Sequence, residues 1–258
     1  MMTQRIYGDI PNIKSDLEKK YGKYKPYTYY MYDDRSILLE NHLFLNDASD
    51  IEINYLPNTI EYLYFKNYKI KTPIIKWPTN LVAISLEYDY DSDGWMSIIN
   101  QLPPTLKFIK IYIKDDKIST CTINWPPNLE VLYLHGCDVS NESISTLPVS
   151  LKLLEIDIFY LDETKKYNTY FDNLPSQLEI LKIDLRTHTN AKYFTSINNL
   201  SNSIQYLSLR YFDYNVLKFP NSLKYLELYN KNKFNDSIIE NIKKNKKPDE
   251  IAVDIVNY

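Results

Sequence analysis

The side chains best suited to bind a metal or to act as a nucleophile are few and widely spaced. His42, His135 and His188 lie far apart along the chain, and no two of them are at the spacing that zinc ligands require. Cys121 and Cys137 flank His135, yet a site built from them would need loops of unrelated segments to converge. We therefore predict neither a metal nor any other cofactor.

Two carboxylates could do acid/base chemistry if the fold brings them together. Asp157 and Asp184 occupy the same position in two related segments, so neighbouring strands would place them side by side. Paired carboxylates also serve general acid/base catalysis, but no nucleophile or deep cleft is expected beside them. We expect a non-enzymatic role, in which the pair meets a Lys or Arg of a partner, with acid/base catalysis as a weaker hypothesis.

Composition excludes several classes of function. The 258 residues carry a net charge of −3, which favours neither nucleic acid nor an anionic membrane as a partner. Only four Gly are present, so phosphate-cradling loops are not expected. Two Cys, an N-terminus without an apolar signal region and the lack of a long apolar run favour a cytoplasmic protein, in the host cytoplasm or a virion if the source is viral.

A repeat organises most of the chain. Its template is a bulky apolar residue, usually Pro, two small or polar residues, and then L-x-x-L-x-L. The template recurs about every 23 residues and starts at Leu56, Trp77, Leu102, Trp125, Leu147, Leu174, Leu200 and Phe219. Such a period is the mark of a solenoid, in which each repeat buries its apolar face against its neighbours.

The template predicts one short strand per repeat. Its last two apolar positions alternate with period two, which indicates a strand with one buried face, and Pro suits the corner before it because Pro cannot donate to a ladder. Segments such as GWMSIINQ and NESIST predict single helical turns on the convex side. The fold class is therefore α/β: a right-handed β/α superhelix with a curved parallel sheet on its concave face.

This organisation resembles the leucine-rich-repeat family. The segment from Leu129 to Val139 matches the fuller family pattern, which implies that Cys137 is a buried ladder residue. The L-P-x-x-L opening resembles the FNIP subtype of social amoebae and of giant viruses that infect amoebae. The other repeats depart from the family at the ladder position, where Tyr68, Asp89, Lys114, Phe159, Arg186 and Phe212 stand in place of Asn or Cys.

Both ends of the stack are predicted to be caps, since an end repeat would otherwise expose its core. Residues 1–55 form the N-terminal cap, with a helix over Ile10 to Tyr21, a hairpin around Asp33–Arg35 and an irregular strand at Ile51 and Ile53. Residues 56–234 hold eight repeats. Residues 235–258 form the C-terminal cap, with a helix that starts at a capping box and ends near Lys247, followed by a strand.

The strand residues that flank the inward leucines should form the open concave face. Three rows result, and the row nearest the strand starts is apolar and aromatic. Tyrosine makes up 25 of the residues and suits binding surfaces, although its abundance throughout the chain is equally compatible with compositional bias. The predicted partner-binding residues are Tyr62, Tyr64, Phe108, Tyr112, Tyr133, Glu155, Asp157, Asp184, Tyr206, Arg210, Tyr225 and Tyr229.

These features predict a protein–protein interaction module. We expect a monomer that binds one protein partner on the concave sheet. Two alternatives stay open: a substrate-recognition subunit for ubiquitin ligase machinery, as the resemblance implies, and a structural or self-assembling protein, for example of a virion.

Overall fold

The structure is a computed structural model of the whole chain. The residues that it describes are 2–7, 16, 19–20, 37–39, 41–46, 52–68, 76–88, 94–113, 123–136, 141–158, 171, 173–185, 200–210, 219–230, 236–247 and 249–257. The predicted helix over Ile10 to Tyr21 lies mostly outside these residues, and so do Cys121, Cys137 and His188.

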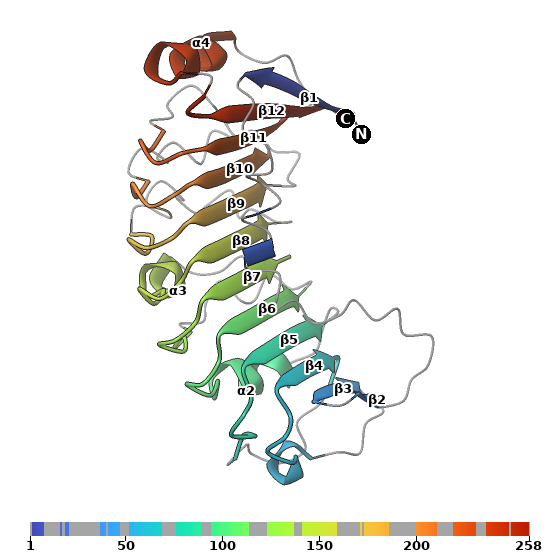
Figure 1. Cartoon of the computed structure of the whole chain (residues 1–258). Coiled ribbons are helices and arrows are strands. Elements are labelled where there is room, and N and C mark those ends of the chain that lie inside the picture. Colours follow the sequence, from blue (N-terminus) through green and yellow to red (C-terminus); the bar gives the residue numbers. More distant parts are fainter. Residues whose placement is uncertain are drawn as a thin grey trace.

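The described chain forms one sheet of twelve strands. Their order across the sheet is β1 (Met2–Tyr7), β12 (Ala252–Asn257), β11 back through β4 in turn, β3 (His42–Asn46) and β2 (Ile37–Leu39). One parallel strand lies in each predicted repeat (Figure 1). These strands are β4 (Tyr62–Lys66), β5 (Ala83–Tyr88), β6 (Phe108–Ile113), β7 (Val131–His135), β8 (Leu153–Ile158), β9 (Ile180–Leu185), β10 (Tyr206–Arg210) and β11 (Tyr225–Asn230). The molecule is a parallel-sheet solenoid.

Each repeat enters the sheet through a tight turn that begins at the second position of the template, which is Ser201 in the repeat from Leu200 and Pro in the others. The amide of Leu178 donates to the Pro175 carbonyl at 3.1 Å, and equivalent bonds recur in the other predicted repeats. The next amides then join the repeats, since those of Glu179 and Ile180 both donate to the Lys152 carbonyl at 2.8 and 3.0 Å. The predicted place of Pro, at the corner before each strand, is confirmed.

A ladder of hydroxyl groups also joins the turns. Ser203 Oγ donates to the Leu178 carbonyl at 2.7 Å, and Ser222 Oγ donates to the Ile204 carbonyl at 2.6 Å. Thr105 Oγ1 and Ser150 Oγ make the same contact with the Leu81 and Leu129 carbonyls of the repeats that precede theirs. In these four repeats the small polar residue before the first Leu or Ile of the template therefore satisfies a carbonyl of the preceding repeat.

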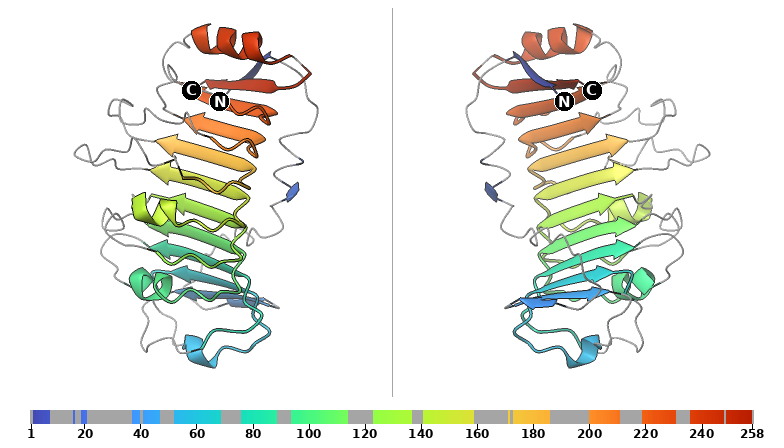
Figure 2. Two further views of the ribbon diagram at one scale, coloured as in Figure 1. Left: turned by 90° about the vertical axis from the view of Figure 1, so that its left-hand side faces the viewer. Right: turned by 90° about the vertical axis from the view of Figure 1, so that its right-hand side faces the viewer.

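The main core lies on one face of the sheet, under the inward Leu and Ile of every repeat. Helices α2 (Gly94–Ile99) and α3 (Asn141–Ser145) lie on this side (Figure 2), and both are the short turns that the sequence predicts. Trp125 is buried there, and its indole N–H donates to the Ser143 carbonyl at 2.7 Å. We call the opposite side, predicted to be concave, the outer face.

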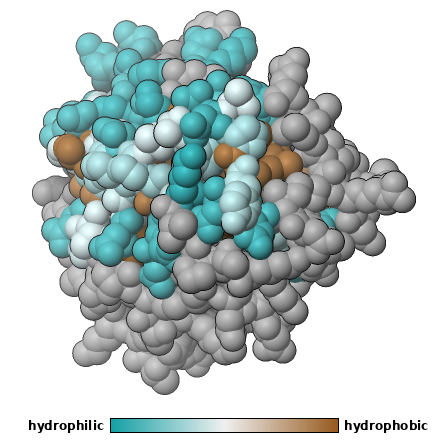
Figure 3. Space-filling view, turned by 90° about the horizontal axis from the view of Figure 1, so that it is seen from below, coloured by the Kyte–Doolittle hydropathy of each residue, from teal (hydrophilic) through white to brown (hydrophobic). Residues whose placement is uncertain are grey.

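The N-terminal end differs from the prediction at Ile53. Strands β2 (Ile37–Leu39) and β3 (His42–Asn46) pair antiparallel, whereas the hairpin predicted around Asp33–Arg35 has its turn outside the described residues. Residues Ile53–Tyr55 form the 3₁₀ helix η1, and the predicted strand at Ile53 is wrong. The further parallel strand is β3, which pairs with β4. Seen from this end, the described surface is mostly hydrophilic with small hydrophobic patches (Figure 3).

The C-terminal end carries helix α4 (Asp236–Asn245) and strand β12 (Ala252–Asn257). Ile242 of α4 is buried, whereas Lys243 and Lys244 are exposed near the helix C-terminus, where cations are favourable. Strand β12 is parallel to β11 and in register with it, and its segment matches the repeat template only in part, since I-x-V-x-I from Ile251 replaces L-x-x-L-x-L. Strand β1 (Met2–Tyr7) pairs with β12 from the other side.

Candidate functional site

All twelve predicted partner-binding residues lie on the outer face, because each strand is in register with its neighbours. They fall in three rows that run across the sheet. The first row, at the strand starts, is Tyr62, Ala83, Phe108, Val131, Leu153, Ile180, Tyr206 and Tyr225. The second row is Tyr64, Ser85, Lys110, Tyr133, Glu155, Lys182, Ser208 and Glu227. The third row is Lys66, Glu87, Tyr112, His135, Asp157, Asp184, Arg210 and Tyr229.

The expectation that the first row is open to a partner is wrong for most of its length. Tyr206 is 0% exposed, Phe108 1% and Tyr225 2%. Together with Val131, Ile180 and their neighbours they form a second hydrophobic cluster on the outer face. These side chains contribute to a core, so they offer no surface to a partner in this conformation.

Three other predicted contact residues differ from one another in burial. Tyr133 and Asp157 are buried as well, at 6% and 4% exposure. Tyr62, at the β4 end of the first row, is only partly buried and stacks on His42 with ring centroids 4.1 Å apart. The first row is therefore closed from β5 to β11 and more accessible at β4.

Buried tyrosine hydroxyls bind carboxylates of the next strand. Tyr206 Oη donates to Glu227 Oε2 at 2.9 Å, and Ser208 Oγ donates to the same oxygen at 3.2 Å. Tyr225 Oη donates to Asp254 Oδ2 at 2.5 Å. Glu227 and Asp254 are themselves 3% and 7% exposed. A carboxylate buried in this way needs such donors, so each phenol contributes packing and also compensates a neighbouring charge.

Tyr64 repeats this arrangement nearer the N-terminal end, at a less buried position. Its hydroxyl donates to Glu87 Oε2, and Lys66 Nζ lies 3.8 Å from the other carboxylate oxygen. Tyr64 also stacks on Phe44 of β3, with ring centroids 4.8 Å apart.

Apart from buried Asp157, the third row is the accessible part of the site. The side chains of Asp184 and Arg210 are 20% and 22% exposed, and Tyr112 and Tyr229 are also partly exposed. Arg210 Nη1 donates to Asp184 Oδ2 at 2.8 Å, and its guanidinium lies 5.5 Å from the centroid of the Tyr229 ring. Asp157 stands in register with Asp184, as predicted, but Arg210 balances the charge of Asp184.

The second row adds a cation and an anion beside this row. Glu155 lies between His135 Nε2, at 3.1 Å, and Lys182 Nζ, at 3.9 Å. Lys182 also lies 5.1 Å from the centroid of the Tyr206 ring. Charges of both signs are thus held in fixed pairs across β7 to β10.

The sequence prediction omitted several residues that belong to this arrangement. His135, Lys182, Ser208 and Glu227 stand in the three rows, and their contacts with carboxylates or hydroxyls were not foreseen. Asp254 was missed because its segment was assigned to the cap and not to the three rows. The alternation of Ile251, Val253 and Ile255 is the signal that places Asp254 on the side opposite these apolar residues.

Within the residues that the structure describes, no three His, Cys, Asp or Glu side chains gather where a metal ion could be held. No helix in the described part of the chain has the length and apolar character needed to cross a bilayer.

A shallow groove of about 450 Å³ runs along the turns before β8 to β11. Its lining is polar and includes Lys152, Gln177, Glu179, Ser203 and Lys224. Lys20, from the N-terminal part of the chain, lies at its edge and binds Glu179 Oε2 through its Nζ at 2.7 Å.

Comparisons with known proteins add a distant likeness. No family model matches the chain, and no curated protein sequence does. A crystal structure described as CroV588, a novel circular LRR protein, is similar with a TM-score of 0.38 and 14% identity, over 78% of this chain. The match covers 39% of that protein, so the chain spans about two fifths of its length. The chain is thus a parallel-sheet solenoid with repeats of about 23 residues that resembles, at a distance, a leucine-rich-repeat protein of the giant virus CroV.

Proposed function

We propose that the protein is a non-enzymatic binding scaffold that holds a protein partner against the third row of its outer face. The observation that carries the proposal is the row itself. It presents Tyr112, Arg210 and Tyr229 with part of their surface accessible, on a rigid sheet and already oriented by neighbours. Aromatic and Arg side chains are the residues that contribute most to protein interfaces.

The size of the row suits a protein. Eight strands about 4.8 Å apart extend over about 40 Å, which can supply the roughly 800 Å² per partner of a standard interface. Pre-formed pairs such as Arg210–Asp184 lose little side-chain entropy on binding, so they favour specificity and fast association.

The buried tyrosines support this scaffold in a different way from the one that the sequence suggests. Tyr206 and Tyr225 are buried and bound to carboxylates, so we propose that they fix the strands and take no part in contact. The proposed contact surface is therefore the third row with the exposed parts of Glu155 and Lys182 from the second.

We further propose a right-handed leucine-rich-repeat solenoid of the FNIP type, monomeric, without a cofactor and located in the cytoplasm. The recurring template and the Pro turn support the subtype. The balanced charge of −3 supports a protein partner over nucleic acid or membrane.

The experiment is a binding titration with two third-row variants. A partner captured from the native cytoplasm is purified, and its affinity for the wild-type protein, Arg210→Ala and Tyr229→Ala is measured by calorimetry. We expect each substitution to weaken binding about 5- to 100-fold, the range of interface residues near the centre of a contact.

Two matched controls keep the test specific. Tyr55→Ala removes an aromatic side chain that is 83% exposed in η1, and Lys243→Ala removes an exposed cation of α4. Both should leave the affinity unchanged. Unchanged binding by Arg210→Ala and Tyr229→Ala, together with weakened binding by either control, would refute the outer-face proposal.

A further inference from the structure

Strand β1 closes one end of the sheet with a segment from the opposite end of the sequence. It pairs antiparallel with β12, and the register places Thr3 opposite Val256 and Gln4 opposite Ile255. From β3 to β12 the described strands are parallel, so β1 is added to the solenoid and does not continue its winding.

The edge of β12 is thus a strand-receiving edge. Without β1, its backbone N–H and C=O groups on that side would be unpaired, which is the situation in which a sheet takes up an extended peptide. The N-terminal strand is attached by about 30 residues to β2 at the far end of the sheet, so β1 reaches β12 as a tethered peptide.

A second contact of the same N-terminal segment lies three strands away. Lys20 Nζ binds Glu179 Oε2 at 2.7 Å, on the turn before β9. The Glu179 side chain is 17% exposed and that of Lys20 is 54% exposed. Glu179 is therefore largely fixed by its repeat, whereas Lys20 is an exposed cation that extends to it from the N-terminal segment.

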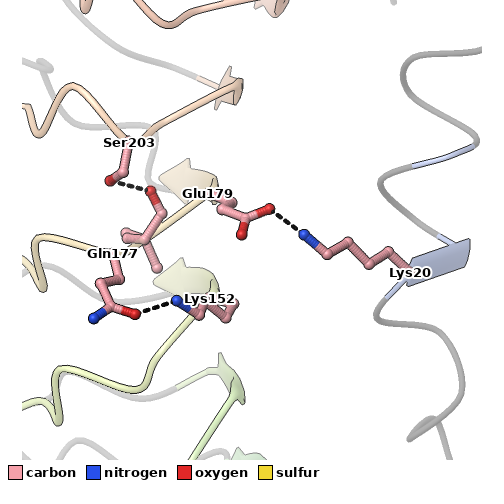
Figure 4. A network of polar contacts seen from close by, with 6 residues as sticks. Lys20, Lys152, Gln177, Glu179 and Ser203 are labelled. Atoms are coloured by element: carbon pink, nitrogen blue, oxygen red, sulfur yellow. Dashed lines mark hydrogen bonds and ion pairs between the residues drawn. The ribbon is translucent and has the colours of Figure 1, made fainter.

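The surroundings of Glu179 are held in place by their own hydrogen bonds (Figure 4). Ser203 Oγ donates to the Leu178 carbonyl at 2.7 Å, and Lys152 Nζ donates to Gln177 Oε1. These residues line the shallow polar groove of about 450 Å³. The short piece of the N-terminal segment at residues 19–20, blue in Figure 2, lies on the opposite side of the sheet from α2 and α3.

The spacing of the two contacts fits one continuous peptide. The 13 residues from Tyr7 to Lys20 can reach about 40 Å when extended, whereas β12 and β9 are three strands, or about 14 Å, apart. The segment is therefore long enough to make both contacts at the same time without strain.

We propose that the β12 edge and Glu179 together form a peptide-recognition site, which the chain's own N-terminus fills in this conformation. The external ligand that it fits is an extended segment of a partner protein that adds an antiparallel strand to β12 and carries a lysine about a dozen residues later. This site is separate from the third row and does not depend on the function proposed for that row.

The contacts that hold the internal segment are individually weak, which makes exchange feasible. An exposed ion pair changes affinity by about 5-fold at most, and a terminal edge strand opens more readily than a central one. Tethering gives the internal segment an effective concentration in the millimolar range, so it excludes free peptides at micromolar concentration.

The test uses the full chain and a labelled peptide of residues 1–20 as the probe. An opened chain carries Gln4→Pro and Arg5→Pro, since two adjacent prolines remove a β12-facing N–H whichever of the two residues supplies it. Fluorescence anisotropy gives the dissociation constant of the peptide for the wild-type and the opened chain. We expect the opened chain to bind at least 10-fold more tightly, because its internal competitor has been removed.

Charge reversal then tests the Glu179 contact. In the opened chain, Glu179→Lys should weaken binding of the peptide about 2- to 5-fold, and a peptide with Lys20→Glu should restore it. Glu130→Lys is the matched control, since Glu130 has the same template position two repeats earlier and should leave peptide binding unchanged. Equal weakening by both reversals would overturn the assignment of Glu179.

Folding of the opened chain is checked by circular dichroism. If that chain is folded and binds the peptide no better than the wild type, the proposal is overturned. If it does not fold, the full chain with Lys20→Glu alone replaces it and should bind the peptide about 2- to 5-fold more tightly than the wild type, and no difference overturns the proposal. None of these readouts involves a third-row variant, so failure here is distinguishable from failure of the outer-face proposal.

Discussion

The first and third rows of the outer face come from the same strands and yet behave differently. In β10, Tyr206 and Arg210 point to the same side four residues apart, but Tyr206 is 0% exposed and the Arg210 side chain is 22% exposed. Tyr206 belongs to a hydrophobic cluster, whereas Arg210 pairs with a charged neighbour. Strand alternation therefore fixes the side on which a residue lies, while its exposure depends on how the surrounding side chains pack there.

The two rows also differ in what removal of a side chain leaves behind. A buried phenol leaves a cavity and a buried carboxylate with fewer donors, whereas an exposed Arg leaves groups that water can solvate. The predictions that follow use this difference, from the largest expected effect to the smallest.

The largest effect is expected from the first row. Tyr206→Ala should lower the free energy of unfolding by about 3–5 kcal/mol, because it leaves a cavity in the cluster and removes a donor from buried Glu227. Urea unfolding followed by circular dichroism measures this change. Tyr229→Ala, in the third row, should cost less than about 1 kcal/mol, and equal losses would mean that the two rows do not differ in burial.

Buried tyrosines should also make the fold sensitive to alkali. Burial, with a smaller contribution from Tyr68, raises the pKa of Tyr88 well above its ordinary value of 10.0. The folded state favours the neutral phenol, so the contribution of Tyr88 to the free energy of unfolding is complete below about pH 10 and is lost as the pH rises towards the raised pKa. Above pH 10, ionisation of Tyr88 in the unfolded state should lower the free energy of unfolding by about 1.4 kcal/mol per pH unit.

The control for the alkaline prediction is Tyr88→Phe. This variant loses the hydrogen bond to the Tyr68 carbonyl, made at 2.7 Å, and should be less stable at neutral pH. Above pH 10 its stability should decline less steeply than that of the wild type, as measured by urea unfolding at each pH. A decline of the same slope would assign the alkaline loss to other groups.

A smaller effect is expected at the turns. Ser222→Ala removes the hydroxyl that donates to the Ile204 carbonyl at 2.6 Å, which should cost about 1 kcal/mol in thermal or urea unfolding. Asn221→Ala is its neighbour and control, because Asn221 is exposed and contributes its backbone N–H, not its side chain, to Asn202. If both substitutions have the same effect, the hydroxyl ladder adds nothing.

The smallest effect on stability is expected in the third row. A double-mutant cycle with Arg210→Ala and Asp184→Ala should give a coupling energy of about 0.2–1 kcal/mol, as for other partly exposed ion pairs. The coupling should decrease with added salt, since the pair is in contact with solvent. A coupling above 2 kcal/mol would place the third row in the same class as the buried first row.

Much of the solenoid was predictable because the repeat is local. Each template supplies its own turn and strand, so Leu174 to Ile183 is enough to predict β9 and its Pro turn. The sequence likewise places Asp157 beside Asp184, since equivalent positions of neighbouring repeats meet in register.

The burial of the first row was not predictable in the same way. An aromatic residue such as Tyr206 suits a second core as well as a binding surface, and the strand pattern does not distinguish the two. The pairing of β1 with β12 has the same difficulty, because Met2–Tyr7 contains no turn or partner signal that links it to residues 252–257. The contact between Lys20 and Glu179 joins residues 159 positions apart, and no local sequence signal predicts it either.

The closure by β1 also sets how the molecule would respond to force. Met2 stands opposite Asn257, so the two termini leave the β1–β12 pair at the same end (Figure 1). A force that pulls the two termini apart acts perpendicular to the paired strands, so their hydrogen bonds break one after another in an unzipping geometry and not together in shear. Traction between the ends should therefore peel β1 away at low force while the stacked repeats behind it remain folded.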